Sequence, residues 1–175
     1  SAFNIKAKSL RLGDFNQAEV YTLLAEHTQE TGQVFTPEAS ALIWELTQGQ
    51  PWLVNALAYE VTWRMKEGRD RSRPVTAEAV RQAKENLILR RVTHLDQLAD
   101  KLREGRVRHV VESILSGAGD PANLPPEDIT YVRDLGLITT VGQLRIANPI
   151  YREVIPRELT YSTQLTINQQ PAWYI

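Results

Sequence analysis

The stretch Gly49–Glu60, GQPWLVNALAYE, decides how the first half of the chain is organised. A glycine and a proline stand before an apolar run with helical spacing, a pattern typical of one helix ending and the next beginning. Thr36 and Pro37 give the same start signal for the preceding helix, which the glycine ends. Two interpretations of the stretch stay open. Pro51 starts a helix and Trp52 covers a gap in the core, or the helix N-terminus faces an anion, with the indole against a base.

Apolar periodicity predicts three further helices around this stretch, so that four helices occupy residues 14–31, 36–48, 51–66 and 76–91. In the first helix Asp14 is the expected N-cap, with Gln17 at the capping-box spacing, and Gly32 ends the helix. Its expected apolar stripe consists of Ala18, Tyr21, Leu24 and Ala25. A polar loop over residues 67–74 precedes the fourth helix, which Thr76 caps. Such short connections favour antiparallel neighbours in an all-α unit.

The second half of the chain follows a different order of elements. We expect two helices, a short helix, two β segments and a helical tail, over residues 94–117, 124–136, 137–140, 143–147 and 149–156. Pro156 is expected to interrupt the tail. Three helices and a β-hairpin are the order of a winged-helix domain, in which the short helix corresponds to the recognition helix. The boundary between the halves is expected between Leu89 and His94.

The composition excludes several kinds of site. The 175 residues have a formal net charge of −1 and no cysteine, which excludes disulfides and thiolate metal sites and fits a cytoplasmic location. No apolar run approaches the roughly 18 residues of a membrane span, so we expect no membrane partner. The three histidines are far apart in the sequence, so no metal site is expected. No GxxxxGKS/T motif occurs, so this sequence has no P-loop to hold nucleotide phosphates.

The charge pattern disfavours nucleic acid as a partner. The six basic residues from Arg90 to Arg108 are interspersed with acidic ones, a mixture typical of a solvated face with salt bridges. The expected recognition helix, residues 126–135, carries three acidic residues and one basic residue, and its negative charge would repel phosphate. We therefore expect the winged helix to contact protein, either a partner or its own chain.

The segment LTQGQPWLVNALA resembles the GxP segment in the helical lid of STAND-type and related AAA+ ATPases. The chain as a whole is similar to the C-terminal part of bacterial AAA-like ATP-binding proteins, through SAFNIKAKSL, HTQETGQVF, GQPWLVNALAYE, ENLILRRVTHLDQLADKL and GLITTVGQLRIANPIYREVIPREL. This resemblance implies a mainly α fold with a four-helix lid-type bundle and a winged-helix domain that has a small β-hairpin. The implied domains are a lid over residues 1–90 with an N-terminal strand remnant, a winged helix over 91–160 and a tail over 161–175.

In such ATPases the P-loop and the acidic Mg²⁺ motifs lie upstream, and the lid closes over the nucleotide. The resemblance therefore implies that Gly49, Gln50, Pro51 and Trp52 face the nucleotide. It also implies that ATP and Mg²⁺ belong to an upstream ATPase domain of the same protein, and that this region holds no cofactor and has no catalytic activity of its own. No arginine of the sensor type is identifiable, because the sequence does not set the orientation of Arg64.

The function implied by the resemblance is that of a nucleotide-dependent regulatory or interaction module with a protein partner. Two alternatives stay open. One is a stand-alone winged-helix regulator that binds DNA, which predicts salt-dependent binding to duplexes. The other is a protein–protein scaffolding module, whose mark would be an exposed apolar patch on the winged helix or at Trp173 and Tyr174.

Overall fold

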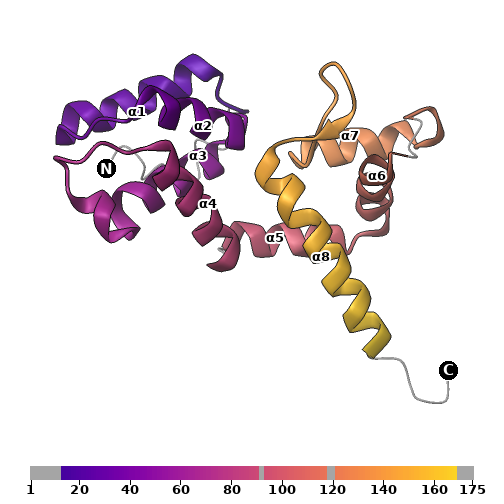
Figure 1. Ribbon diagram of the computed structural model, residues 1–175. Coiled ribbons are helices and arrows are strands. Elements are labelled where there is room, and N and C mark those ends of the chain that lie inside the picture. Colours follow the sequence, from indigo (N-terminus) through magenta and orange to yellow (C-terminus); the bar gives the residue numbers. More distant parts are fainter. Residues whose placement is uncertain (1–12, 91–92, 118–120, 169–175) are drawn as a thin grey trace. The chain divides into compact units, whose positions relative to one another are not determined.

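The computed structural model describes residues 13–90, 93–117 and 121–168 (Figure 1). This part of the chain is mainly helical, with eight α-helices and one two-stranded antiparallel sheet. The chain divides into two compact units, Ser1–Val92 and Thr93–Ile175, and the division falls in the interval that the change of pattern indicates. The expected N-terminal strand remnant and the aromatic C-terminal end lie outside the described residues.

The first unit is built from helices that pack around α2. Its elements are α1 (Gln17–Thr31), α2 (Pro37–Thr47), α3 (Pro51–Tyr59), a π-helix (Glu60–Arg64), a 3₁₀ turn (Lys66–Arg69) and α4 (Ala77–Arg90). α2 contacts α1, α3 and α4. Each of the four α-helices contributes to the buried core, which includes Val20, Leu24, Ile43, Leu53, Leu57, Val80 and Leu87. A parallel bridge between Phe35 and Val75 joins the segments that lead into α2 and α4.

Local capping explains where most of these helices begin. The Thr36 hydroxyl accepts a hydrogen bond from the Ala39 N–H at 3.1 Å, and Pro37 occupies the first turn of α2, as predicted. Thr76 caps α4 in the same way, through the Ala79 N–H at 3.2 Å. Gly32 ends α1 with a left-handed φ of 79°, again as predicted. These contacts span three or four residues, so a sequence pattern can predict them.

The start and the buried face of α1 differ from the prediction. Asn16 rather than Asp14 is the N-cap, because its side chain and that of Glu19 each accept from the other's backbone N–H, at 2.9 and 3.2 Å. The buried residues are Val20, Leu24 and His27, whereas the other members of the expected stripe are exposed. The prediction of the apolar stripe was wrong, because in the folded chain α1 packs through a face that includes His27.

The third helix is shorter than expected and continues in a different geometry. α3 ends at Tyr59, and the next turn widens into the π-helix, closed by a bond of 2.9 Å from the Met65 N–H to the Glu60 carbonyl. A 3₁₀ turn then begins the segment expected to be a loop. Gly68 in this turn lies so close to the π-helix that a Cβ would stand 1.7 Å from the Val61 carbonyl oxygen. Close backbone packing of this kind requires glycine.

The second unit contains α5 (Thr93–Leu102), α6 (Gly105–Ser116), a 3₁₀ turn (Pro121–Asn123), α7 (Pro126–Asp134), β1 (Ile138–Thr139), β2 (Arg145–Ile146) and α8 (Pro149–Asn168). The two strands are antiparallel, with Ile138 opposite Ile146 and Thr139 opposite Arg145, and are shorter than predicted. α6 packs against α7, and α8 packs against α5 and β2. The core of this unit includes Leu95, Leu98, Leu102, Val107, Val110, Val111, Val132, Ile150 and Ile155.

α8 continues through Pro156, so the prediction that this proline interrupts the helix was wrong. Proline lacks the N–H that would bond the carbonyl four residues earlier, and both Pro156 and Arg152 are exposed. Ile150, Val154 and Ile155 are buried on the inner face, which favours a continuous helix. The expected tail over 161–175 is therefore helical as far as Asn168.

Candidate functional site

The predicted nucleotide-facing segment lies at the turn between α2 and α3. Gly49 is buried at a φ of 77°, and its carbonyl accepts a hydrogen bond of 2.8 Å from the Phe15 N–H. Gln48, not Gly49, is the C-cap of α2, with a φ of 46°. A Cβ on Gly49 would stand 1.9 Å from the Phe15 carbonyl oxygen. The glycine is thus explained by close contact between two backbone segments.

The first turn of α3 is capped by its own chain. The Gln50 side chain accepts from the Leu53 N–H at 2.7 Å, and the Gln50 carbonyl accepts from the Val54 N–H at 3.0 Å. Pro51 has no N–H and is buried, while Trp52 is half-buried. Because these donors are engaged, the helix start is accounted for without an anion, and a role toward nucleotide stays a prediction. One turn further, the Asn55 Oδ1 is buried, and within residues 13–90, 93–117 and 121–168 no group donates a hydrogen bond to it.

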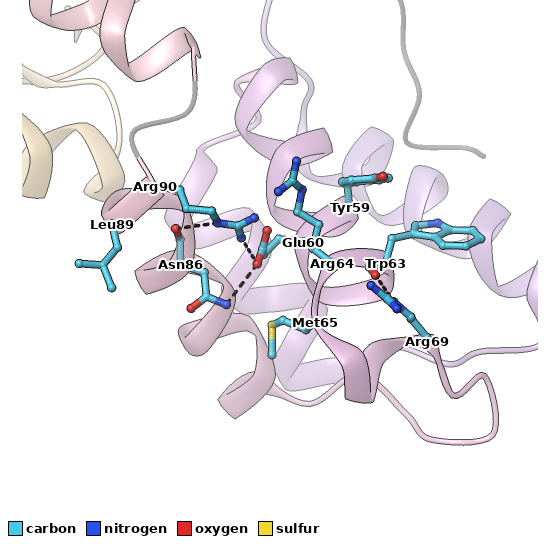
Figure 2. A pocket seen from close by; sticks show the side chains of 9 residues that line it. All are labelled: Tyr59, Glu60, Trp63, Arg64, Met65, Arg69, Asn86, Leu89 and Arg90. Atoms are coloured by element: carbon cyan, nitrogen blue, oxygen red, sulfur yellow. Dashed lines mark hydrogen bonds and ion pairs between the residues drawn. The ribbon is translucent and has the colours of Figure 1, made fainter.

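A pocket of about 860 Å³, which no sequence pattern predicted, lies between the π-helix and the end of α4 (Figure 2). Its lining residues are Tyr59, Glu60, Trp63, Arg64, Met65, Arg69, Asn86, Leu89 and Arg90. We call it the π-helix pocket. The apolar spacing of the third helix runs straight through the region where the π-helix forms, so no break in the pattern indicated the widened turn. π-helical turns are frequent at functional sites.

A buried carboxylate forms the base of the π-helix pocket. Glu60 is only 2% exposed, and Figure 2 shows it between Asn86 and Arg90. The Asn86 amide donates to its carboxylate at 3.1 Å, and the Arg90 guanidinium forms an ion pair with the same oxygen. A buried charge needs such pairing and hydrogen bonding to be tolerated. Glu60, Asn86 and Arg90 are therefore satisfied by one another.

This pairing predicts a stability effect. An Arg90→Met substitution leaves Glu60 buried without its counter-ion, and we expect it to lower the free energy of unfolding by about 2 kcal/mol, less than for a fully buried pair because Arg90 is partly exposed. Arg81→Met is the matched control, since Arg81 pairs with Glu78 at the surface. We expect it to cost less than about 0.5 kcal/mol. Urea unfolding followed by circular dichroism measures both, and equal losses would contradict the assignment.

The rim of the π-helix pocket is aromatic and basic. Tyr59, Trp63 and Leu89 are 44%, 41% and 76% exposed. The Arg69 Nε donates to the Trp63 carbonyl at 2.6 Å, and Figure 2 shows these two residues side by side. Arg64 is exposed, and in the described part of the chain no carboxylate pairs with Arg64 or Arg69. The rim thus combines apolar contact area with positive charge that lacks a counter-ion.

Behind the pocket, a buried network holds the segment between the π-helix and α4. Gln33 is fully buried, and its amide nitrogen donates to the carbonyls of Gly68 and Arg73 at 2.9 and 3.2 Å. Its Oε1 accepts from Arg71 at 2.8 Å, and the Arg71 guanidinium lies 4.5 Å from the ring centre of Trp63. The network therefore connects α1's C-terminal end to the rim of the π-helix pocket.

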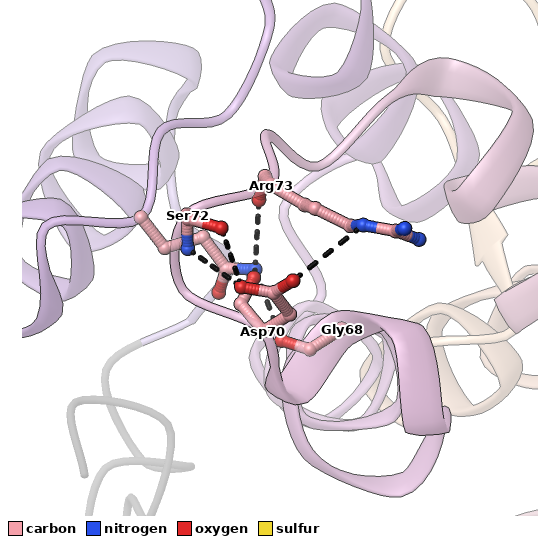
Figure 3. A network of polar contacts seen from close by, with 5 residues as sticks. Gly68, Asp70, Ser72 and Arg73 are labelled. Atoms are coloured by element: carbon pink, nitrogen blue, oxygen red, sulfur yellow. Dashed lines mark hydrogen bonds and ion pairs between the residues drawn. The ribbon is translucent and has the colours of Figure 1, made fainter.

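The turn itself is closed by Asp70. Its carboxylate accepts from the Ser72 N–H at 3.1 Å and from the Ser72 hydroxyl at 2.6 Å, and it forms an ion pair with Arg73 at 3.5 Å (Figure 3). These hydrogen bonds lower the pKa of Asp70. A second hollow, of about 340 Å³, lies beside this turn; Gln33 and Met65 contribute to its lining.

His27 is the other buried member of this network, and it predicts a dependence of stability on pH. Its Nε2 lies 2.9 Å from the Gln33 Oε1, and burial lowers its pKa, an effect to which the nearby Arg71 adds. The unfolded chain then binds a proton at this ring more readily than the folded chain. The free energy of unfolding should therefore fall as the pH drops below the ordinary histidine pKa of about 6.5, until the lowered folded-state pKa is passed.

Urea unfolding between about pH 7.5 and pH 5 measures this dependence. In a His27→Gln variant, the free energy of unfolding should depend less steeply on pH, because the contribution of His27 is removed. A His109→Gln variant is the control for the substitution itself, because His109 is exposed and lies outside the buried network. If both variants keep the slope of the parent, His27 is not its source.

Three of the six basic residues predicted to lie on a salt-bridged face pair there with acidic neighbours, whereas Arg90 pairs with the buried Glu60. Lys101 pairs with Glu104 at 3.1 Å, and two further pairs are Arg103 with Asp100 at 3.7 Å and Arg108 with Glu112 at 2.8 Å. Arg106 stacks on the ring of Tyr131 at 3.4 Å, and the Tyr131 hydroxyl donates to Glu104 at 2.8 Å, which lowers the pKa of that carboxyl. Arg91 lies outside the described residues.

The surface of α7 is acidic. Glu127 and Asp134 are exposed, Asp128 is half-buried, and the single base, Arg133, lies 3.4 Å from the Asp134 carboxylate. At the tip of the β-hairpin Val141 is 78% exposed. This arrangement offers little to a phosphate backbone.

No three His, Cys, Asp or Glu side chains in the described part of the chain come together in a cluster that could hold a metal ion. None of its helices combines the length and the hydropathy that crossing a bilayer requires. Comparison of the chain with family models, curated proteins and solved structures found no match.

Proposed function

We propose that this chain is the helical lid and winged-helix region of an AAA-like or STAND-type ATPase, and that it acts as a nucleotide-dependent interaction module without catalytic activity of its own. The observation that carries the proposal is the π-helix pocket, whose rim exposes Tyr59, Trp63 and Leu89 beside two arginines that pair with no carboxylate among the described residues. Exposed aromatic, apolar and arginine side chains gathered at one place are typical of a protein interface.

The second unit supports the winged-helix part of the proposal through its order of elements. α5, α6 and α7 are followed by the β1–β2 hairpin and by α8, which packs back on α5 and β2. The acidic surface of α7 favours a protein surface over DNA as its partner. A gel shift with random duplex at low salt tests the DNA-binding alternative, and we expect no shift.

The nucleotide is proposed to bind to a domain outside this sequence. The chain contains no GxxxxGKS/T motif, so ATP and Mg²⁺ would be held by an upstream ATPase domain. Gly49 to Trp52 are proposed to lie near that nucleotide.

The reading frame that encodes this chain tests the proposal first. A P-loop motif upstream of Ser1 is expected, and its absence would rule out the ATPase part. The upstream region, expressed separately, should then bind this chain with an affinity that differs between ATP and ADP, as measured by calorimetry. Calorimetry of this chain alone with ATP and Mg²⁺ is the control; micromolar binding would contradict the proposal.

A further inference from the structure

We infer that the π-helix pocket binds a peptide segment that carries an apolar side chain flanked by carboxylates. The inference specifies the partner chemistry of the interaction role proposed above and rests on that role only in taking the partner to be a protein. The first support is the composition of the lining. Aromatic side chains, methionine, leucine and arginine line the pocket, and lysine and aspartate are absent from the lining. Protein interfaces are enriched in aromatic residues, methionine and arginine in the same way.

The charges of the lining residues favour a partner segment that is negatively charged. Three arginines face one carboxylate, that of Glu60, which is already engaged by Arg90 and Asn86. Arg64 and Arg69 therefore keep a positive charge that no carboxylate in the described part of the chain balances. Guanidinium groups bind carboxylates through paired, charge-assisted hydrogen bonds. A segment with two acidic side chains supplies this complement.

The apolar residues that line the pocket favour an apolar side chain between the two carboxylates of the partner segment. Trp63 and Leu89 are exposed at the rim, and Met65 is half-buried deeper in the pocket. An apolar side chain placed against these three would remove their surface from water, which is the main favourable term in association. Arg69 lies beside Trp63, so a carboxylate adjacent to that side chain can reach it.

Two other classes of ligand fit the pocket less well. Residues 13–90 contain eight lysines and arginines against eleven aspartates and glutamates, so a polyphosphate chain that extends beyond the basic rim meets no further excess of positive charge, whereas a short segment with two carboxylates needs only the rim. A small ligand is usually enclosed with most of its surface buried. Here the rim residues Tyr59, Trp63 and Leu89 stay between 41% and 76% exposed, a shape that suits one face of a larger partner.

Three matched synthetic peptides test the inference against the full chain. They share the same central apolar residue and carry Glu, Gln or Lys at the positions on either side of it, and fluorescence anisotropy of labelled peptide measures binding. We expect the Glu peptide to bind most tightly and more weakly as salt is raised. Arg64→Gln and Arg69→Gln should each weaken it about fivefold. Arg81→Gln, which removes an arginine on α4 that does not line the pocket, should leave it unchanged.

The fluorescence emission of Trp63 tests whether the peptide binds at the π-helix pocket. The chain has four tryptophans, so the change in emission on adding the Glu peptide should disappear in a Trp63→Phe variant that still folds by circular dichroism. Equal binding of the Glu and Gln peptides, an equal loss in Arg81→Gln, or no binding of any peptide would overturn the inference. So would single-stranded oligothymidylate that binds more tightly than the Glu peptide and depends on Arg64. Each of these results leaves the upstream-domain test of the proposed function intact, so the two failures are distinguishable.

Discussion

A Gly49→Ala variant is expected to lose about 4 kcal/mol of unfolding free energy, a large part of the stability of a small domain. Alanine at a φ of 77° costs about 1–2 kcal/mol, and its Cβ would overlap the Phe15 carbonyl oxygen, which adds about 1–3 kcal/mol because two backbone segments must separate. The contact also holds the hydrogen bond from the Phe15 N–H to the Gly49 carbonyl. Urea unfolding followed by circular dichroism measures the loss.

Gly32→Ala provides the matched control for this experiment. Gly32 has nearly the same φ, 79°, but a Cβ there meets no atom within 4 Å. We expect it to cost only about 1–2 kcal/mol, from the backbone conformation alone. If the two variants lose the same amount, the close contact with Phe15 does not constrain Gly49. In that case the interpretation of this glycine as a packing residue fails, and the nucleotide-facing interpretation gains weight.

The second large effect is expected at Gln33. Gln33→Met keeps the length of the side chain but removes the acceptor for Arg71 and the donor for the carbonyls of Gly68 and Arg73, all in a buried position. Buried polar groups left without partners cost about 1–3 kcal/mol each, and Arg71 keeps its bond to the Thr62 carbonyl, so we expect a loss of about 3 kcal/mol.

Gln29→Met is the control for this change, because Gln29 is exposed on α1. It should alter the unfolding free energy by less than about 0.5 kcal/mol. Hydrogen exchange adds a local readout: the backbone amides of residues 66–73 should exchange faster in Gln33→Met and at the parental rate in Gln29→Met. Unchanged exchange in this segment would show that Gln33 does not hold it.

The sequence predicted those parts of the fold that depend on near neighbours. The starts of α2 and α4 follow from Thr36, Pro37 and Thr76, whose contacts reach no further than the next turn. The order of helices and hairpin in the second unit was also correct at this level. What failed depends on distant parts of the chain. α8 passes through Pro156 because its inner face is buried, a fact that a rule about proline and its neighbours does not contain.

In the candidate site, too, the features set by neighbouring residues were predicted and those set by distant residues were not. The sequence pattern singled out Gly49, Gln50 and Pro51, because glycine and proline mark helix ends. Their contacts in the structure are those of a helix start. The π-helix pocket was missed because Glu60 and Arg90 are thirty positions apart and each looks like an ordinary surface charge. Only the packing of α4 against the π-helix brings them together.

The unbroken course of α8 also sets a length scale. At 1.5 Å per residue, its 20 residues measure about 30 Å from Pro149 to Asn168. Ile150 and Ile155 anchor the first turns in the core of the second unit, and each later turn lies about 5.4 Å further along the helix axis. A dye attached at Asn168 would therefore lie about 30 Å along the helix axis from Pro149, the residue at which α8 leaves the hairpin.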